Sequence, residues 1–226
     1  MRTAFFGGSF DPPHRGHLAI ARAAAQRLSL DRVWMAPAGT QPLKLDAGAT
    51  SYTDRLAMVE LAVAGEPRIS ASSVDAPRTD GRPNYTMDVL LDLKRGLRTG
   101  DELFFLLGAD AFLSLKQWHR ASELPMVCGL IVAGRPGFSM DDVASALPDG
   151  VRATQKEDSA PGVLTWELRN DAGQRSSLDW MPDLHEDISA TDIRAAIAGD
   201  PSGRPSGEGV LAAPVLRYIK AKGLYH

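Results

Sequence analysis

The sequence is poor in cysteine, has no long apolar run and carries no large excess of either charge. Its single cysteine, Cys128, excludes a disulfide within the chain, and no cysteine and histidine cluster has the spacing of a zinc site. No apolar run approaches the ~20 residues of a membrane-spanning helix, and no signal peptide is visible. We therefore expect a cytoplasmic protein without a membrane partner.

The charge balance argues against a nucleic-acid partner. The 226 residues carry a formal net charge of −3, and 44% of them are apolar, as in an ordinary globular protein. With no global basic field to attract a polyanion, phosphate must be bound by a local site. This length suffices for a sizeable core, and we expect residues 1–226 to form a single domain.

Short apolar segments that favour strands alternate with helical patterns along the first part of the chain. The strand-like segments are residues 3–6, 33–37, 68–74, 102–107 and 127–133. This order predicts an α/β fold with a doubly wound, mainly parallel sheet and helices on both faces. Ligands in such sheets bind beyond the carboxyl ends of the strands, so the turns that follow the strands should share one site. Those turns lie at residues 7–17, 39–44, 108–110 and 134–137.

The second half of the chain has less regular patterns. Residues 163–168 alternate like a half-exposed strand, and the turn-forming residues 170–173 follow, so a hairpin is expected. Residues 188–226 are interpreted as a C-terminal helical segment, whose last helix is bracketed by Pro214 and Gly223.

Residues 5–17, with the sequence FFGGSFDPPHRGH, combine the end of a strand, a glycine turn and a helix start. Such a corner binds phosphate in doubly wound folds. Gly7 and Gly8 let the backbone turn where a Cβ would clash, and they let a ligand approach closely. His14 and His17 would face the same way in the first helical turn. Two imidazoles beside free helix N–H groups suit an anion that gains charge during a reaction, whereas the alternative is a capped helix without a ligand.

The run from Gly7 to His17 resembles the GGxFxPxHxGH signature of the nucleotidyltransferases with HxGH motifs, and among them the bacterial nicotinate-nucleotide adenylyltransferases. The resemblance implies a Rossmann-like nucleotidyltransferase domain. It also implies that ATP contacts this run through Gly7, Gly8, Ser9, Phe10, His14 and His17. Residues 139–186 form a longer stretch than the resemblance leads us to expect, and we interpret them as a candidate insertion.

A second phosphate site is predicted at the helix that begins near Ser189. Its free N–H groups, the hydroxyls of Ser189 and Thr191 and the guanidinium of Arg194 can all bind phosphate oxygens. Residues 188–194 resemble the second signature of the family, ISxTxIR. The resemblance implies that Arg194 and this helix hold the ATP triphosphate opposite the two histidines. The alternative is an ordinary capped helix with a solvated arginine.

The resemblance places further residues around a pyridine mononucleotide. The family stacks a tryptophan on the pyridine ring, and Trp118 stands at that position with a broad flat indole suited to stacking. Asp110 is expected to bind the sugars of both nucleotides, because a carboxylate accepts hydrogen bonds from hydroxyls. We expect His119, beside Trp118, at the surface. The full set predicted for the mononucleotide is Lys44, Tyr85, Thr86, Asp110, Trp118 and Arg135.

Each of these assignments has a structural alternative. Lys44 and Arg135 would otherwise be solvated cations, Thr86 a helix cap and Trp118 a core residue. Three neighbouring residues also depart from the family pattern, namely Leu43 for a histidine, Asn84 for a serine and Gly134 for an arginine.

The reaction that the resemblance implies is adenylyl transfer from ATP to nicotinate mononucleotide, which gives deamido-NAD and pyrophosphate. A phosphate dianion is already an adequate nucleophile, so no general base is required. His14, His17 and Arg194 are the predicted catalytic residues, because they would neutralise the α-phosphate and the departing pyrophosphate. Magnesium is expected to be carried with ATP, since no acidic cluster in the sequence suggests a dedicated metal site.

Two other functions stay open. One is phosphopantetheine adenylyltransferase, although members of that family are shorter and lack a stacking position such as Trp118. The other is a non-catalytic nucleotide-binding sensor, against which the intact His14, His17 and Arg194 argue. The sequence also leaves open the choice between the acid and amide mononucleotides, the oligomeric state, a homo-oligomer included, and the role of residues 139–186.

Overall fold

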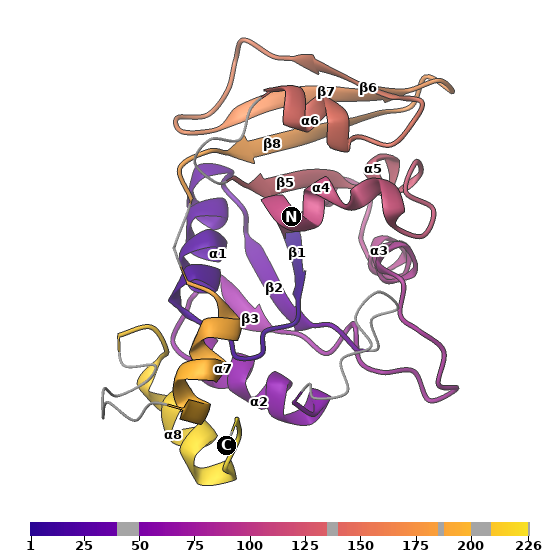
Figure 1. The fold of residues 1–226 in the computed structure, drawn as a ribbon. Helices are drawn as coiled ribbons and strands as arrows, with labels where there is room; N and C mark the ends of the chain where they lie inside the picture. The colour runs from indigo at the N-terminus through magenta and orange to yellow at the C-terminus, as the bar shows by residue number, and fades with distance from the viewer. Residues whose placement is uncertain (40–49, 135–139, 185–187, 200–208, 226) are drawn as a thin grey trace.

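The strands form one sheet with helices on both of its faces. The computed structural model describes residues 1–39, 50–134, 140–184, 188–199 and 209–225. Its eight strands lie in the spatial order β3-β2-β1-β4-β5-β8-β7-β6 (Figure 1). The strands are β1 (Arg2–Gly8), β2 (Arg32–Pro37), β3 (Ile69–Ala71), β4 (Glu102–Gly108), β5 (Gly129–Ala133), β6 (Val151–Gln155), β7 (Leu164–Asn170) and β8 (Arg175–Met181). The helices are α1 (Arg15–Arg27), α2 (Tyr52–Val63), α3 (Thr86–Arg95), α4 (Ala109–Leu113), the 3-10 turn η1 (Leu115–Gln117), α5 (Leu124–Val127), α6 (Met140–Ala146), α7 (Ala190–Gly199) and α8 (Ala213–Lys222).

The strands β3, β2, β1, β4, β5 and β8 run parallel, whereas β7 and β6 add an antiparallel edge. The chain begins at β1 in the middle, builds outward through β2 and β3, and then returns to the other side of β1 with β4 and β5. The strand order therefore reverses between β1 and β4. Their carboxyl ends, at Gly8 and Gly108, flank the crevice in which a doubly wound sheet binds its ligand. The predicted fold class is confirmed.

Two apolar layers cover the sheet, which explains the continuous apolar run at the start of the chain. Phe5 belongs to the layer that holds α3, α4 and α5, and its ring stacks on that of Phe105 with centroids 5.6 Å apart. Phe6 points to the opposite layer, which holds α1. Because successive side chains of a strand face opposite sides, both layers are anchored by neighbouring residues of β1.

One predicted strand starts later than expected. The strand predicted at residues 127–133 begins at Gly129, because α5, with Pro125 in its first turn, continues through Val127. Cys128 lies between the two elements and is buried, as predicted, and its burial raises the pKa of the thiol to about 12. The predicted third strand is also shorter, since β3 lies at the sheet edge and pairs with β2 alone.

The irregular stretch at residues 139–186 extends the sheet. β8 pairs in parallel with β5, and the turn at residues 170–173 joins it to β7 in the predicted hairpin. Gly173 supplies the left-handed backbone of that turn, with φ of 79°. The described part of the stretch is thus continuous with the parallel strands, and its interpretation as an insertion stays a prediction.

The C-terminal helices α7 and α8 lie beside α2, at the opposite end of the molecule from β6 and β7 (Figure 1). The apolar cluster that joins them is built from Met58, Ala62, Ile193, Leu211, Val215 and Ile219. Pro214 lies at the start of α8, and Gly223 ends it with φ of 60°, as predicted. Within the described ranges, no helix combines the length and apolar character that crossing a membrane requires.

Candidate active site

The corner between β1 and α1 lies at the carboxyl edge of the sheet. Gly8 ends β1, and a Cβ on it would lie 3.0 Å from a ring atom of Phe10, tighter than ordinary van der Waals contact. The left-handed residue of the turn is Phe10, with φ of 47°, and not a glycine. The buried Phe10 ring also packs edge-on against His17, with centroids 4.9 Å apart. Gly8 therefore allows the Phe10 ring to pack closely against the backbone, and that ring packs in turn against the ring of His17.

His14 and His17 begin α1 as a stacked pair. His14 is the N-cap, and His17 is the third helical residue. The backbone N–H of His14 donates to Nδ1 of His17 over 3.2 Å, and the two ring centroids lie 3.7 Å apart. Because Nδ1 of His17 accepts this bond, the proton of the neutral ring lies on Nε2, which is left as a donor.

His17 is neutral in the free protein. Its burial, together with the nearby His14, lowers the pKa of His17 to about 3. The ring therefore offers a phosphate oxygen an N–H group and not a full positive charge. The helix N-terminus and a permanently charged group can supply positive potential at this corner.

Arg194 of α7 supplies that charge. Its Nη1 donates to the backbone carbonyl oxygen of Asp11 over 2.7 Å, and its Nη2 lies 3.3 Å from Oγ1 of Thr191. Ser189 caps α7, since its Oγ accepts from the backbone N–H groups of Thr191 and Asp192 over 3.2 and 3.4 Å. The structure thus brings together the two helix starts that the sequence predicted to converge.

A cavity of about 710 Å³ opens at the carboxyl ends of β1 and β4, within the range of ligand pockets. Ile188 and Ala190 line it on either side of Ser189, so the start of α7 forms part of its wall. Arg194 and Thr191 stand beside this wall. The predicted site residues that line the cavity are Gly7, Gly8, Ser9, Phe10, His14, His17, Tyr85, Thr86, Asp110 and Trp118.

Part of the cavity lining is aromatic. Nε1 of Trp118 donates to Oγ of Ser114 over 3.0 Å, which orients the indole. Tyr85 is the N-cap of α3, and its ring stacks on that of His119 with centroids 4.2 Å apart and an angle of 30°. His119 is exposed, as predicted, yet it also lines the cavity. These rings offer the flat surface that an aromatic ligand requires.

The loop between β3 and α3 carries a buried carboxyl group to the cavity. Nδ2 of Asn84 closes this loop by donating to Oδ1 of Asp75 and to the carbonyl oxygen of Ala76, each over 2.8 Å. Burial raises the pKa of Asp75 to about 6, although Asn84 and the backbone N–H of Gly39 donate to it. Asp75 and Asn84 both line the cavity.

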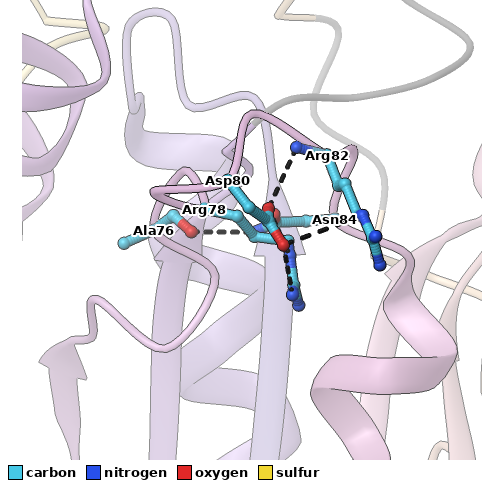
Figure 2. Close-up of polar contacts among 5 residues, drawn as sticks. All are labelled: Ala76, Arg78, Asp80, Arg82 and Asn84. Carbon is cyan, nitrogen blue, oxygen red and sulfur yellow. Dashed lines mark hydrogen bonds and ion pairs between the residues drawn. The ribbon is translucent and has the colours of Figure 1, made fainter.

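The outer part of the same loop is held by exposed charges (Figure 2). Arg78 donates to both oxygens of Asp80, over 3.0 and 2.9 Å, and the backbone N–H of Arg82 donates to Oδ1 over 3.1 Å. These bonds from Arg78 and Arg82 lower the pKa of Asp80 to about 2. They fix the loop tip without entering the cavity wall.

Two predicted residues lie outside the part of the chain that the structure describes, and some cavity residues were not predicted. Lys44 and Arg135 lie outside the described residues, so their roles stay predictions. Asp110 lies in the first turn of α4 and lines the cavity, as its predicted role requires. Asp75 was missed, although an acidic residue soon after a strand was a usable signal. Asn84 was noted only as a departure from the family pattern.

Comparison with known proteins indicates the chemistry. A cytidylyltransferase-like family model matches residues 5–196. A probable nicotinate-nucleotide adenylyltransferase of Laribacter hongkongensis is 41% identical over 100% of this chain and 94% of its own length, and one of Chromobacterium violaceum is 37% identical over 99% and 98%. The solved structure of a Plasmodium falciparum nicotinic acid mononucleotide adenylyltransferase with NaAD superposes with a TM-score of 0.70 over 99% of this chain and 97% of that one. At 16% identity, this last similarity supports the fold.

Proposed function

Because the chain belongs to the cytidylyltransferase-like family, with nicotinate-nucleotide adenylyltransferases as relatives along its full length, we propose that it transfers the adenylyl group of ATP to nicotinate mononucleotide in NAD biosynthesis. The products are deamido-NAD and pyrophosphate. The observation that carries the proposal is a cavity lined by His14 and His17 at the β1–α1 corner, with Arg194 beside that corner, and by the aromatic rings of Tyr85, Trp118 and His119. A polyphosphate and a pyridine ring need these two different environments.

The reaction exchanges one phosphoanhydride bond for another. An oxygen of the mononucleotide 5′-phosphate attacks the α-phosphorus of ATP in line. The new P–O–P bond forms while the bond from the α-phosphorus to the bridging oxygen breaks, and pyrophosphate leaves with that electron pair. No proton has to be removed from the nucleophile, so the protein acts by orientation and by charge stabilisation.

A few groups at the β1–α1 corner and at the start of α7 perform these tasks. We assign His17 the role of a neutral donor, through Nε2–H, to an oxygen of the α-phosphate. His14 lies against it at the same helix start. Arg194 and the positive ends of the α1 and α7 dipoles supply the positive potential that stabilises the departing pyrophosphate. Ser189 and Thr191 add hydroxyls at the start of α7.

We assign the aromatic part of the cavity lining to the mononucleotide. Trp118 would stack on the pyridine ring, with Tyr85 beside it. The start of α3, at Thr86, presents backbone N–H groups, which suit the carboxylate of nicotinate better than a neutral carboxamide. Asp110, which also lines the cavity, would accept hydrogen bonds from ribose hydroxyls.

Magnesium is proposed to enter as its complex with ATP. Among the residues that the structure describes, no three histidine, cysteine, aspartate or glutamate side chains gather at one point. ATP oxygens and water would therefore provide most of its ligands. Bound in this way, the ion would neutralise charge on the phosphate oxygens.

Initial rates with different acceptors test the proposal. ATP and magnesium are held fixed, and nicotinate mononucleotide, nicotinamide mononucleotide and phosphopantetheine are compared by the release of pyrophosphate. We expect the fastest turnover with nicotinate mononucleotide. A preference for phosphopantetheine would contradict the substrate assignment, and no turnover with any of them would favour the sensor. Action in the cytoplasm, without a nucleic-acid partner, stays a prediction.

A further inference from the structure

Tyr225, which follows α8, contacts the phosphate corner directly. Its hydroxyl donates to Oδ1 of Asp11 over 2.6 Å. Asp11 stands between Phe10 and His14 in the corner and is 6% exposed, so the bond is shielded from water. Burial and the bond to Asp11 raise the pKa of Tyr225, and its hydroxyl therefore stays a donor at neutral pH.

Asp11 joins three segments that are distant in sequence. Its Oδ2 accepts from the backbone N–H of Thr50, just before α2, over 3.3 Å. Its carbonyl oxygen accepts from Nη1 of Arg194 over 2.7 Å, and its Oδ1 accepts from Tyr225. A displacement of Asp11 would therefore move the anchor of Arg194 and the start of α1 together.

The segment that carries Tyr225 is itself fixed to the body of the protein. Val215 and Ile219 of α8 are fully buried in the cluster shared with α2. Just before α8, the carbonyl oxygens of Gly209 and Val210 accept from Nη1 and the backbone N–H of Arg15, over 2.8 and 2.9 Å. Because α8 is packed and bonded in this way, the Tyr225 side chain that follows it has a fixed position relative to the β1–α1 corner.

We propose that Tyr225 is a positioning residue for adenylyl transfer, whose hydrogen bond to Asp11 holds the β1–α1 corner and Arg194 at the spacing that a triphosphate requires. The inference rests on the proposed function for its reaction, but its effect on ATP binding can be measured separately. Tyr225 acts through Asp11 and not on a substrate. Its loss should therefore affect ATP, and not the mononucleotide, whose predicted contacts Tyr85 and Trp118 belong to the start of α3 and the end of η1 and not to the corner that Asp11 holds.

Tyr218 provides a matched control on α8. Its hydroxyl donates to Oδ1 of Asp54 in α2 over 2.8 Å. This bond joins α8 to the body with the same pair of residue types, but Asp54 is not part of the described cavity lining. Tyr218→Phe and Tyr225→Phe each remove one hydroxyl and one tyrosine–aspartate bond. A difference in kinetics between the two variants would therefore come from where the lost bond lies and not from the groups that formed it.

The test compares both variants with the wild type in melting temperature, steady-state kinetics for each substrate and calorimetric affinity for a non-hydrolysable ATP analogue. For Tyr225→Phe we expect kcat/KM for ATP to fall about tenfold and the analogue to bind more weakly, with an unchanged KM for the mononucleotide. Tyr218→Phe should keep wild-type kinetics, although both variants melt earlier. Wild-type ATP kinetics and binding in Tyr225→Phe, or an equal loss in Tyr218→Phe, would overturn the proposal.

A second pair of variants approaches the same bond from Asp11. Asp11→Asn keeps an oxygen that can accept from Tyr225, whereas Asp11→Ala does not. We expect kcat/KM for ATP to fall further in Asp11→Ala, and equal losses would contradict the positioning role. If the wild type does not use nicotinate mononucleotide but Tyr225→Phe still binds the ATP analogue more weakly than Tyr218→Phe, the reaction assignment fails and the positioning role stands.

Discussion

Nη1 of Arg194 lies 2.7 Å from the backbone carbonyl oxygen of Asp11, although 183 residues separate the two in sequence. This bond places the first turn of α7 beside the helix start that carries His14 and His17. A triphosphate between the two helix starts would meet the positive ends of two helix dipoles and a cation held in place. Substitutions at either start should therefore affect ATP more than the second substrate.

Arg194→Ala is expected to lower kcat/KM for ATP by about 10–100-fold, the loss typical of one charge-assisted hydrogen bond. Arg194→Lys keeps the charge but not the planar fork, so its kcat/KM should lie between those of the wild type and the alanine variant. Arg217→Ala, on the exposed side of α8, is the control and should behave like the wild type. The measurement is steady-state kinetics with each substrate varied in turn. A larger change for the mononucleotide than for ATP would contradict the assignment.

His17→Ala should reduce kcat by ~10²–10³, the range for the loss of one donor that stabilises developing charge, while the fold survives. His17→Gln can place an amide N–H near the position of Nε2, so it should retain more activity than His17→Ala. Turnover is measured by pyrophosphate release, with circular dichroism as the check on folding. Unchanged turnover in a folded His17→Ala protein would refute the role of this ring.

Local patterns in the sequence were sufficient for most elements of the first part of the chain and for the two helix starts that are predicted to bind phosphate. The pattern of Phe5 and Phe6 marks a strand buried on both faces, and Ser189 marks the start of α7, because each signal depends on neighbouring residues. The backbone geometry of the turn between β1 and α1 could not be predicted from the sequence. The left-handed residue is Phe10 and not a glycine, which only its packing under His17 explains.

Contacts between distant segments could not be predicted from such patterns. Asp75 reaches the cavity because Asn84 closes the loop around it, and no periodicity marks either residue. His119 was predicted at the surface, but its stacking on Tyr85 brings it to the cavity as well. The bond from Tyr225 to Asp11 depends on how α8 packs against α2, which the sequence of neither segment encodes alone.

Trp118→Ala should weaken binding of the mononucleotide by about tenfold or more, the effect of losing one stacked aromatic surface, and leave ATP nearly unaffected. Trp118→Phe retains part of that surface and should be intermediate. Ser114→Ala removes the acceptor that orients the indole and should produce a smaller loss in the same direction. Separate KM values for the two substrates check this. An equal rise of both KM values in Trp118→Ala would show that the indole does not stack on the pyridine ring.

Asp75 should make the folded protein less stable as the pH rises. The residue is 8% exposed, and burial raises its pKa to about 6 from an ordinary value of 3.8. Between these values the unfolded chain loses its proton first, so the folded state binds more protons. The contribution of this group to the free energy of unfolding therefore falls as the pH rises from about 4 to about 6. The gap corresponds to about 3 kcal/mol.

Asp75→Asn removes this titration and keeps an oxygen that can accept from Asn84. Relative to the wild type, the variant should gain about 1–3 kcal/mol of unfolding free energy between about pH 4 and about pH 7, measured by chemical denaturation. Asp80→Asn is the control, because Arg78 lowers the pKa of the exposed Asp80 to about 2, and its difference from the wild type should stay nearly constant over that interval. If the difference in unfolding free energy between Asp75→Asn and the wild type also stayed constant over this pH interval, the buried carboxyl would ionise in the folded protein as it does in the unfolded chain.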